Sequence, residues 1–304
     1  MIAVDWGSSS LRAFRVESDG RVRETRRTDQ GLLHIGGRFA DVLGQLIDGW
    51  DDALVVLAGM VGSRQGWQEV PYVQAPVGLQ DIAAGMRLLD GDAMPGRALW
   101  LVPGVSCFDA HQVPDVMRGE ETQLCGLLPT LGAGSHQVLL PGTHSKHVRI
   151  VDGRIEGFST FMTGEVFAVL SKHSILGRTQ QPSERFQAEA FDRGVHVARS
   201  NDGQRGVLST LFSARTLGLT GELAPDQQPD YLSGLLIGHE LAGLPDSAKH
   251  KPIILVGAAP LCARYQRALA LCGFAHVSLA QEAAERGLWQ LAVAAGLTQP
   301  VLEA

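Results

Sequence analysis

The chain has 304 residues, a mass of 32.5 kDa, 45% hydrophobic residues and 19% charged residues. This length and composition are typical of a packed globular protein, and we expect two domains, each with an apolar core of its own. The net charge of -6 and the lack of a stretch dense in lysine and arginine argue against a nucleic-acid-binding surface and against a basic membrane-binding helix.

No feature of the sequence indicates export or membrane insertion. Residues 1–7 lack the basic and then apolar layout of a signal peptide, and no run approaches the roughly 18 apolar residues of a spanning helix. These features predict a cytoplasmic protein. The cysteines form no CxxC pair and lie in apolar segments, so we expect reduced core thiols at Cys107, Cys125, Cys262 and Cys272.

The first part of the chain predicts three strands and a tight turn. Residues 2–6 form an apolar run, and residues 11–16 alternate between apolar and polar side chains. Residues 22–28 follow across an Asp-Gly pair, which supplies the positive φ angles that a tight hairpin requires.

The next segments predict helices and buried strands. Residues 39–50 have a helical period, and residues 53–63 form a short apolar run that ends in a glycine-rich loop. Residues 98–106 repeat this change from strand to loop. Residues 120–128 predict a helix that ends before a proline and a Gly-Ala-Gly linker.

After this linker the pattern of the N-terminal segment returns. The run QVLLPGTHSKHVRIVDGRIEGFSTFMTG again predicts a strand, a turn of glycine and hydroxyl residues, a second strand, an Asp-Gly hairpin and a third strand. Gly7 and Gly20 are 13 positions apart, and Gly142 and Gly153 are 11 positions apart, so the two segments are similar in kind and in length. An internal repeat of this kind predicts two related halves.

The remaining residues predict mainly helices and then a regular alternation. Strands that alternate with helices of this length are typical of an α/β layer structure. Helices are expected at residues 164–177, 183–198, 206–217 and 229–244, followed by a strand at 252–257, a helix at 258–273, a strand at 275–280 and a closing helix at 283–297.

The two turns of glycine and hydroxyl residues are candidates for phosphate binding. Neither turn matches the phosphate-binding motif GxxxxGK[ST], or the motif GxGxxG after a strand. The presence of two similar turns indicates instead that one hairpin from each half holds the phosphates of one nucleotide. The glycines let the backbone approach phosphate oxygens, while hydroxyl and N–H groups donate. The proposed residues are Gly7, Ser8, Ser9 and Ser10 in the first turn and Gly142, Thr143, His144 and Ser145 in the second.

Asp5 adjoins the first turn and has no acidic counterpart in the second, where Leu140 and Pro141 take the equivalent places. A carboxylate there can hold Mg²⁺ through water, because this metal prefers one or two carboxylates together with phosphate oxygens. The alternative is a capping role at the hairpin. Lys146 can reach a phosphate as a point charge, or it can be a solvated lysine of the strand.

Motifs along the whole chain resemble one known family. The runs MIAVDWGSSSLRAFRV, GMVGSRQGWQEVPYV, VPDVMRGEETQLCGLL, LLPGTHSKHV, FMTGEVFAVLSKHSIL and ILVGAAPL resemble the 2-dehydro-3-deoxygalactonokinases, sugar-acid kinases of the sugar kinase/Hsp70/actin superfamily. The resemblance implies an α/β protein with two ribonuclease-H-like (actin-like ATPase) domains and an interdomain cleft for ATP and substrate. It also implies that DWGSSS and PGTHS are the phosphate motifs and LVGAAP is the adenosine motif.

The implied adenosine motif also has a physical basis. Gly257 and Ala258 lie between a predicted strand and a predicted helix. Because they lack bulky side chains, an adenine ring or a ribose can lie on the backbone near the helix N-terminus. The alternative is the close-packed turn of an ordinary α/β layer.

A hydroxyl that attacks ATP needs a carboxylate to accept its proton. The resemblance to hexokinase-like members of the superfamily implies a base just before a helix at the end of the first half, although those members use aspartate. Glu121 before Thr122 fits this place best, with Glu120 and Asp115 as rivals. Acidic residues in the first turn of a helix can also be purely structural, because they interact favourably with the helix dipole.

A keto-deoxy sugar acid carries a carboxylate and several hydroxyls, so its pocket should offer an arginine and hydrogen-bonding side chains. The loop after the predicted strand 53–63 and the start of RGEET supply such residues. Trp67 can instead be a core anchor for this loop. The candidates are Ser63, Arg64, Trp67, Glu69 and Arg118, with the two arginines proposed for the carboxylate.

These arguments predict an ATP- and magnesium-dependent kinase. Its first domain is expected at residues 1–130 with the closing helix 285–304, and its second at residues 131–284. The resemblance implies transfer of the γ-phosphate of ATP to the 6-hydroxyl of 2-dehydro-3-deoxy-D-galactonate in galactonate catabolism, without a nucleic acid or a membrane as partner. A kinase for another sugar acid such as 2-dehydro-3-deoxygluconate, and an actin- or Hsp70-like nucleotide switch, are the alternatives. Whether the protein forms a homo-oligomer stays open.

Overall fold

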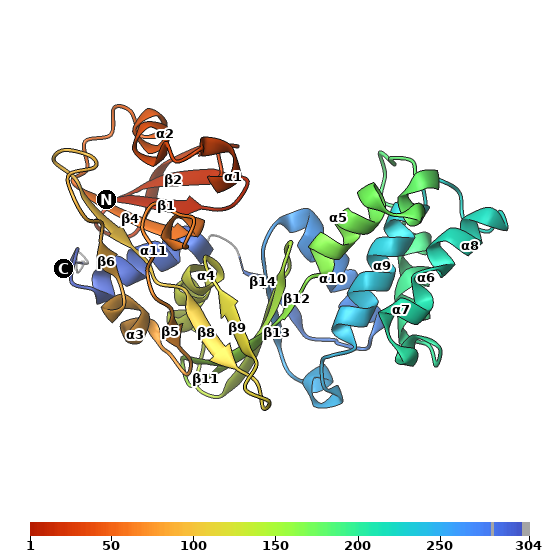
Figure 1. Ribbon diagram of the computed structural model, residues 1–304. Helices are drawn as coiled ribbons and strands as arrows, with labels where there is room; N and C mark the ends of the chain where they lie inside the picture. The colour runs from red at the N-terminus through yellow and green to blue at the C-terminus, as the bar shows by residue number, and fades with distance from the viewer. Residues whose placement is uncertain (281–282, 300–304) are drawn as a thin grey trace. The chain divides into compact units, whose positions relative to one another are not determined.

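The computed structural model describes residues 1–280 and 283–299. The chain divides into two compact units (Figure 1). Unit 1 comprises Met1–Ser135, Arg149–Phe158 and the described residues from 283 onward, and unit 2 comprises His136–Val148 and Ser159–Ala280. Residues 281–282 of the predicted second domain and residues 300–304 of the predicted closing helix lie outside the described residues.

A six-stranded sheet forms the centre of unit 1. Its strands are β1 (Ile2–Trp6), β2 (Leu11–Val16), β3 (Val22–Thr28), β4 (Leu54–Gly59), β6 (Arg87–Leu88) and β7 (Ala98–Leu101). The strand order is β3-β2-β1-β4-β7-β6. β1, β4 and β7 are parallel, while β2 and β3 extend the sheet on one side as an antiparallel meander.

The sequence pattern explains this meander. The side chains of β1 are mostly buried, as expected for a central strand, while β3 at the sheet edge is polar and mostly exposed. Gly20 has a φ of 87° in the hairpin between β2 and β3, as the Asp-Gly pair predicts. The three predicted strands are confirmed at their predicted bounds.

A second, three-stranded sheet in unit 1 was not expected from the sequence patterns. It has the order β5-β8-β9, and strands this short contain too few residues for a clear alternation. The predicted helix 39–50 ends at residue 46. The bounds are β5 (Val73–Gln74), β8 (Val105–Phe108), β9 (Pro114–Met117), α1 (Leu32–Ile35), α2 (Phe39–Leu46), α3 (Leu79–Ala84) and α4 (Glu120–Leu127).

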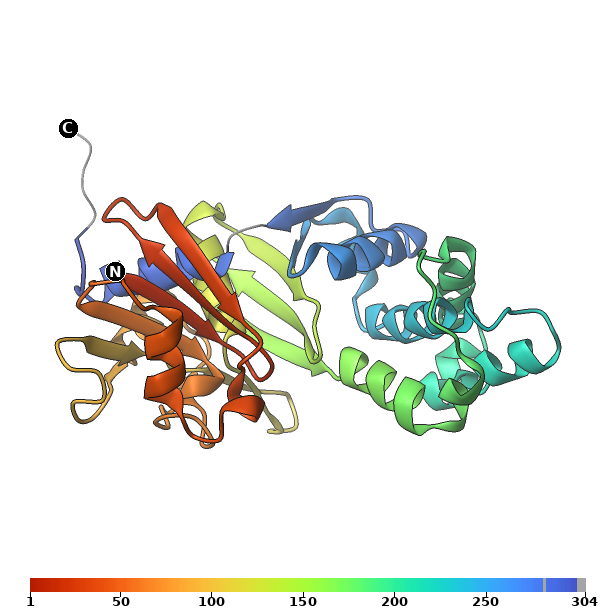
Figure 2. The same cartoon turned by 90° about the horizontal axis from the view of Figure 1, so that it is seen from above.

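The helix α11 (Ala283–Ala294) packs against α4, α3 and β1 of unit 1. In both views the blue α11 lies beside the red to yellow elements of this unit (Figures 1 and 2). A Cβ at Gly287 would lie 1.7 Å from the Thr122 carbonyl oxygen, and a Cβ at Gly126 would lie 2.2 Å from the Ala283 carbonyl oxygen. These two glycines therefore let α4 and α11 touch through their backbones.

Unit 2 is built on a five-stranded sheet that repeats the topology of the first. Its strands are β10 (Ser135–Leu140), β11 (Ser145–Val151), β12 (Arg154–Phe161), β13 (Ile253–Val256) and β14 (Val277–Ala280). The order β12-β11-β10-β13-β14 corresponds to β3-β2-β1-β4-β7, with β10, β13 and β14 parallel. The internal repeat predicted from the sequence is therefore present in the structure.

The tip of the hairpin β11–β12 groups with unit 1. Ile155 pairs with Val77 as an isolated antiparallel bridge, with the Ile155 N–H donating to the Val77 carbonyl at 2.7 Å. Arg154 donates to the Pro76 carbonyl at 2.7 Å and lies 3.0 Å from Asp81. The segment Arg149–Phe158, which contains the end of β11 and the start of β12, therefore belongs to unit 1, while the remaining residues of these two strands belong to unit 2.

Helices make up most of unit 2, and α5 and α6 each pack against α9 (Figure 1). Gly194 and Gly234 allow the closest approach, since a Cβ at either would lie about 2 Å from a carbonyl oxygen of the facing helix. The predicted helix 183–198 begins only at residue 188, and the predicted helix 206–217 is two short helices. The bounds are α5 (Thr163–His173), α6 (Ala188–Arg199), α7 (Val207–Thr210), α8 (Ser213–Leu219), α9 (Gln228–Leu241) and α10 (Ala259–Leu271).

Short 3-10 turns connect several of these elements, namely η1 (Met60–Gly62), η2 (Leu128–Thr130), η3 (Ile175–Thr179), η4 (Gly203–Arg205) and η5 (Asp246–His250). Within residues 1–280 and 283–299, no helix is both long and apolar enough to cross a membrane. No disulfide joins the four cysteines, and Cys272 is half-buried while the others are buried.

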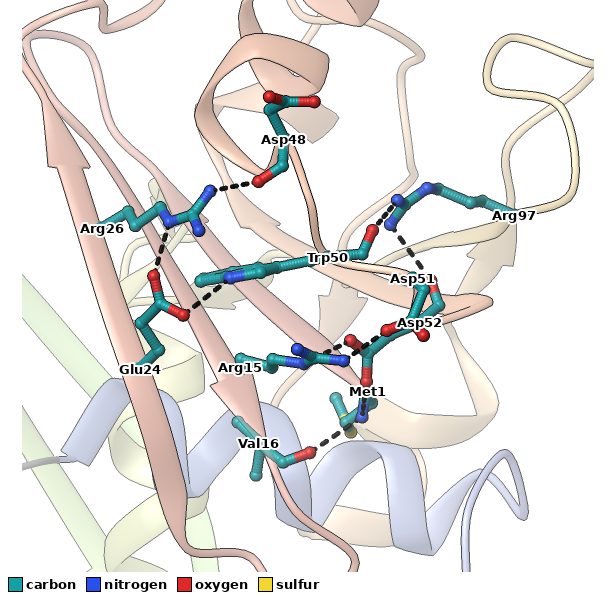
Figure 3. A network of polar contacts seen from close by, with 10 residues as sticks. All are labelled: Met1, Arg15, Val16, Glu24, Arg26, Asp48, Trp50, Asp51, Asp52 and Arg97. Atoms are coloured by element: carbon teal, nitrogen blue, oxygen red, sulfur yellow. Dashed lines mark hydrogen bonds and ion pairs between the residues drawn. The ribbon is translucent and has the colours of Figure 1, made fainter.

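A network of polar contacts fixes the start of β1 in unit 1 (Figure 3). The Met1 nitrogen donates to the Val16 carbonyl at 2.8 Å and to Asp52 Oδ1 at 3.1 Å, and Arg15 Nε lies 2.8 Å from Asp52 Oδ2. Burial opposes the charged form of Asp52, but these donors and positive charges outweigh it and lower the pKa of Asp52. The opposite end of β1 carries Asp5.

Candidate active site

The first predicted phosphate turn connects β1 to β2. The Gly7 N–H donates to the Ser10 carbonyl at 2.9 Å, which closes the turn, and the Ser8 and Ser9 side chains are exposed. Gly31 packs directly beneath it, because a Cβ there would lie 2.4 Å from the Ser8 carbonyl oxygen and from the Ser10 nitrogen. The backbone of the turn is therefore supported by Gly31, while the side chains of Ser8 and Ser9 are exposed.

Asp5 forms an ion pair with Arg12 that the sequence analysis missed. Arg12 Nη2 lies 2.5 Å from Asp5 Oδ2, and the two residues are direct partners in the antiparallel register of β1 and β2. The register follows from the short turn that joins Trp6 to Leu11, so the length of this turn was the available signal. In the described part of the chain, the Asp5 Oδ1 atom has no protein hydrogen-bond partner.

The glycines at 59 and 119 bring the start of α4 to the end of β1. A Cβ at Gly59 would lie 2.6 Å from the Trp6 carbonyl oxygen, and a Cβ at Gly119 would lie 3.5 Å from the Gly59 Cα. Gly119 has a φ of 110°, a backbone conformation that residues with a Cβ atom rarely adopt. The Glu120–Glu121 pair is thereby placed beside the strand that carries Asp5.

The structure separates the two glutamates by burial. Glu121 has 0% exposure, with Oε2 accepting from the Gly119 N–H at 2.6 Å and Oε1 accepting from the Thr122 hydroxyl at 3.2 Å. Glu120 is only half-buried, and its Oε2 accepts from the Arg118 N–H at 3.1 Å. Asp115, the other rival for the base, lies on β9 and is half-buried.

Burial, together with the adjacent charge of Glu120, raises the pKa of Glu121 to about 8. The N–H groups of its own helical turn work in the opposite direction without outweighing burial. At pH 7 a group with this pKa is mostly protonated. Of the two neighbouring carboxyl groups, burial therefore favours the neutral form of Glu121.

The predicted substrate residues fall into two groups in unit 1. Ser63 and Arg118 are close together, because a Cβ at Gly62 would lie 2.9 Å from Arg118 Nη1. Arg118 donates to the Val70 carbonyl at 2.7 Å, and its guanidinium stacks on the Tyr72 ring at 4.5 Å. Ser63 Oγ and the Nε and Nη1 atoms of Arg118 are buried without a hydrogen-bond partner among the described residues.

The other three substrate candidates lie on the loop that follows. The Arg64 side chain is 84% exposed and makes a long ion pair of 3.8 Å with the exposed Glu69. Trp67 is packed into the core of unit 1, stacked on Phe39 with ring centroids 5.5 Å apart and edge-on to Trp6. Trp67 is therefore an anchor for the loop, the alternative that the sequence left open.

The second predicted phosphate turn, in unit 2, has the same support as the first. A Cβ at Gly164 would lie 2.4 Å from the Gly142 carbonyl oxygen, and the Glu165 N–H donates to the Thr143 carbonyl at 3.0 Å. His144 is exposed and pairs with Glu165. A Cβ on Gly142 itself would meet no atom within 4 Å, so open space lies beside this glycine.

Ser145 has a different position from the other residues of this turn. Its side chain is 1% exposed, and its hydroxyl lies 2.8 Å from the Tyr265 hydroxyl inside unit 2. Lys146 is also buried, with Nζ donating to the Thr160 hydroxyl at 2.7 Å, so it is not the solvated lysine that was the alternative. Thr143 and His144 are the exposed side chains of the turn.

The predicted adenosine motif lies at the N-terminus of α10. Ala258 is the N-cap residue, and both it and Gly257 are exposed. Gly257 has a φ of 153°, and a Cβ there would lie 3.3 Å from the Pro141 carbonyl oxygen. This contact places the motif next to the second phosphate turn within unit 2.

A cavity of about 490 Å³ in unit 2 begins at the same turn. Gly142, Thr163 and Gly164 form one end of its lining, and residues 182–186 together with side chains of α5, α9 and α10 form the rest. Arg264 of α10 stacks on the Phe186 ring at 4.6 Å and is held by Asp230 at 2.5 Å. The sequence analysis did not find these lining residues, because residues 182–186 contain no recognisable motif. They are identified as part of the cavity only by their closeness to the second turn in the structure.

The described residues contain no group of three or more His, Cys, Asp or Glu side chains that could hold a metal ion by themselves. Asp5 nevertheless fits Mg²⁺, which is usually bound by one or two carboxylates and by phosphate oxygens. Its carboxylate is partly exposed, keeps one oxygen clear of protein donors and adjoins the first phosphate turn.

Comparisons with known proteins give a consistent result. The family model described as 2-keto-3-deoxy-galactonokinase matches residues 5–291. A probable 2-dehydro-3-deoxygalactonokinase of Rhizobium meliloti is 37% identical, over 95% of this chain and 97% of that protein. A 2-dehydro-3-deoxygalactonokinase of Escherichia coli is 36% identical, over 90% of each chain.

Solved structures agree with these matches. A crystal structure that carries the same name provisionally, from Sinorhizobium meliloti, is 39% identical and has a TM-score of 0.87, over 96% of this chain and 98% of that chain. An activator of 2-hydroxyisocaproyl-CoA dehydratase from Clostridium difficile, with bound ADPNP, has a TM-score of 0.52 at 12% identity, over 97% of this chain and 94% of that chain, and shows the fold alone. The predicted α/β fold of the actin-like ATPase type is thereby confirmed. The chain belongs to the 2-keto-3-deoxy-galactonokinase family.

Proposed function

We propose that this protein transfers the γ-phosphate of ATP to the 6-hydroxyl of 2-dehydro-3-deoxy-D-galactonate, a step of galactonate catabolism. Family membership supports the phosphotransfer and the class of substrate. The main structural support for the proposal is that the two units have the same strand order and the same kind of turn after the first strand. Each has an exposed turn after its first strand, and each turn is supported from below by a glycine, Gly31 or Gly164.

The turns supply the phosphate donors, one in each unit. In unit 1 these are Gly7, Ser8, Ser9 and Ser10, and in unit 2 they are Gly142, Thr143 and His144. The cavity at the second turn accommodates the nucleoside of ATP, because about 490 Å³ lies within the 300–1,000 Å³ range of small-molecule sites. Gly257 and Ala258 form the exposed backbone beside it.

Asp5 is the residue that would hold Mg²⁺, through water. When bound, the ion neutralises negative charge on the phosphate oxygens. Arg12 sets the orientation of the Asp5 carboxylate through its ion pair, so the oxygen that is clear of protein donors is held in one direction.

Glu120 is the group that we assign as the proton acceptor. A base must be ionised at the working pH and must reach the substrate hydroxyl. Glu121 fits the second requirement less well than Glu120, because its side chain has no exposed surface and both of its oxygens accept hydrogen bonds within the protein. Glu121 instead holds the Gly119 backbone and so positions Glu120, which is half-buried.

The sugar acid binds at the loop of unit 1 that carries Ser63 and Arg64, beside Arg118. The exposed Arg64 guanidinium is available to a carboxylate, because its ion pair with Glu69 is long. Buried donors without a partner cost about 1–3 kcal/mol each. Ser63 Oγ and Arg118 Nε and Nη1 are such donors, so oxygen atoms of a ligand would be stabilised there.

The test of this proposal is ADP release from the purified protein with Mg-ATP, measured with 2-dehydro-3-deoxygalactonate, with its gluconate epimer and without acceptor. We expect rapid release with the galactonate compound alone and a phosphate ester at carbon 6 in the NMR spectrum of the product. Release that is equally fast without acceptor would support the nucleotide-switch alternative. Faster release with the epimer would give the enzyme a different substrate.

A further inference from the structure

A chain of hydrogen bonds runs from the second phosphate turn into the interior of unit 2. The Ser145 hydroxyl, in the turn, lies 2.8 Å from the Tyr265 hydroxyl on α10. Tyr265 in turn donates to Glu240 Oε2 on α9 at 2.5 Å. The other oxygen of Glu240 lies 2.8 Å from His147 Nε2, two residues beyond the start of β11.

All four side chains are nearly sealed from solvent. Their exposed fractions are 1% for Ser145 and Tyr265, 4% for Glu240 and 8% for His147. A carboxylate buried to this extent is costly unless its oxygens are hydrogen-bonded, and here both of them are. Both oxygens of the Glu240 carboxylate are therefore hydrogen-bonded, at a place where the turn and β11 meet α9 and α10.

The donor and acceptor roles within the network are set by its chemistry. Burial raises the pKa of the Tyr265 hydroxyl, and the nearby Glu240 carboxylate raises it further, so the hydroxyl stays protonated. Its single proton goes to Glu240, so Ser145 must donate to the Tyr265 oxygen. Thr163, the first residue of α5, also hydrogen-bonds Tyr265.

The consequence for the turn is a fixed backbone. Because the Ser145 proton is used toward Tyr265, the Ser145 oxygen is left to accept, and the Gly142 N–H points to it at 3.4 Å. Thr163 precedes Gly164, whose Cα faces the Gly142 carbonyl. One phenol hydroxyl thus connects both sides of the turn, while Thr143 and His144 remain exposed at its tip.

We propose that Tyr265, oriented by Glu240, is a positioning residue that fixes the second phosphate turn in the conformation that binds the phosphates of ATP. The inference rests on the proposed function, since it assumes that this turn binds nucleotide. Tyr265 is 1% exposed and borders the cavity at this turn, and its hydroxyl acts on the turn through Ser145 and Thr163. The sequence predicted that Ser145 donates to phosphate, but its hydroxyl donates to Tyr265 instead.

The test compares two tyrosine variants that lose the same atom. Tyr265→Phe removes the hydroxyl at the centre of the network. Tyr231→Phe is the matched control, because Tyr231 is also fully buried in unit 2 and its hydroxyl also has a serine partner, Ser213 Oγ at 2.6 Å. Mg-ADP affinity is measured by titration calorimetry, together with the KM for ATP, the KM for the sugar acid and the unfolding midpoint.

We expect Tyr265→Phe to weaken Mg-ADP binding and raise the KM for ATP by about tenfold or more, with the KM for the sugar acid within twofold of wild type. Tyr231→Phe should lower the unfolding midpoint and leave nucleotide affinity within twofold. If Tyr265→Phe lowers only the unfolding midpoint, as the control does, its role is structural and the proposal is wrong.

Ser145→Ala provides a second variant in case Tyr265→Phe does not fold, because it removes the other end of the same contact and leaves the aromatic packing intact. It should weaken Mg-ADP binding to a similar extent, and unchanged binding would overturn the proposal. Binding is measured without the sugar acid, so the result does not depend on turnover. A wild-type protein that binds Mg-ADP but releases no ADP with any acceptor would refute the proposed function and leave this inference standing.

Discussion

Gly164 lies directly against the backbone of Gly142, so that a Cβ at position 164 would fall 2.4 Å from the Gly142 carbonyl oxygen. Gly31 has the same relationship to Ser8 in the other unit, also with a separation of 2.4 Å. Each turn that we propose as a phosphate site is therefore supported by a glycine from a later segment. Because no real Cβ contact is this short, the conformations of both turns depend on these glycines.

Gly164→Ala should reduce both stability and ATP affinity. The added methyl group must displace the Gly142 carbonyl or move α5, and overpacking of this kind costs about 1–3 kcal/mol. We expect a lower midpoint in thermal unfolding and a KM for ATP raised by about tenfold. Gly157→Ala is the control, because a Cβ there meets no atom within 4 Å, and equal effects of the two variants would contradict the prediction.

Gly142→Ala should separate binding from folding. Its Cβ would enter open space in the protein, so the unfolding free energy should stay within about 0.5 kcal/mol of wild type. The same methyl group would occupy the space through which a phosphate oxygen approaches the backbone. We expect a KM for ATP raised by about tenfold or more in steady-state kinetics, and an unchanged KM would show that phosphate does not approach this glycine.

Glu120→Gln and Glu121→Gln should differ in their effects on turnover. Loss of a general base typically lowers the rate by about 10²–10⁴-fold. We expect a loss of this size in kcat for Glu120→Gln with the KM for ATP unchanged. Glu121→Gln keeps a neutral side chain of similar shape next to the Gly119 N–H, so its kcat should fall by less than about tenfold. The reverse order would identify Glu121 as the base.

The burial of Glu121 also predicts how stability depends on pH. The folded-state pKa of about 8 lies above the ordinary value of 4.5, so between these values the unfolded chain has lost a proton that the folded chain retains. The contribution of Glu121 to stability is therefore fully present below pH 4.5 and is lost as the pH rises toward 8. The slope is at most about 1.4 kcal/mol per pH unit.

Glu121→Gln should remove this part of the pH dependence. The variant and the wild type can be compared by urea unfolding at several pH values from 5 to 8. We expect the wild type to lose stability relative to the variant as the pH rises. Parallel curves would mean that Glu121 is ionised in the folded protein at neutral pH.

The substrate loop predicts a selective change in KM. Arg64→Gln should raise the KM for the sugar acid by about tenfold and leave the KM for ATP unchanged, because the guanidinium is exposed and its ion pair with Glu69 is long. Arg23→Gln, on the exposed edge strand β3, serves as the control for the loss of one positive charge. If both variants have the same KM for the sugar acid, Arg64 does not bind its carboxylate.

Much of the fold could be predicted from the sequence, because strands, tight turns and amphipathic helices depend on neighbours along the chain. β1, β2 and β3 follow from alternation and an Asp-Gly pair, and the second copy of this pattern predicts the repeated sheet. The very short strands β5 and β6 contain too few residues for a pattern to be visible.

Composition and motifs by themselves determined the α/β class, the two turns, the family resemblance and the acidic pair at 120 and 121. Only the tertiary structure decided which side chains of these motifs face outward. Ser145 looks like its exposed neighbour Thr143 in sequence, yet its hydroxyl is bound to Tyr265, 120 residues later in the chain. Glu120 and Glu121 are adjacent, yet only Glu121 is sealed from solvent. Burial and pairing depend on segments that are distant in sequence, and these segments change the chemistry of a motif without changing its letters.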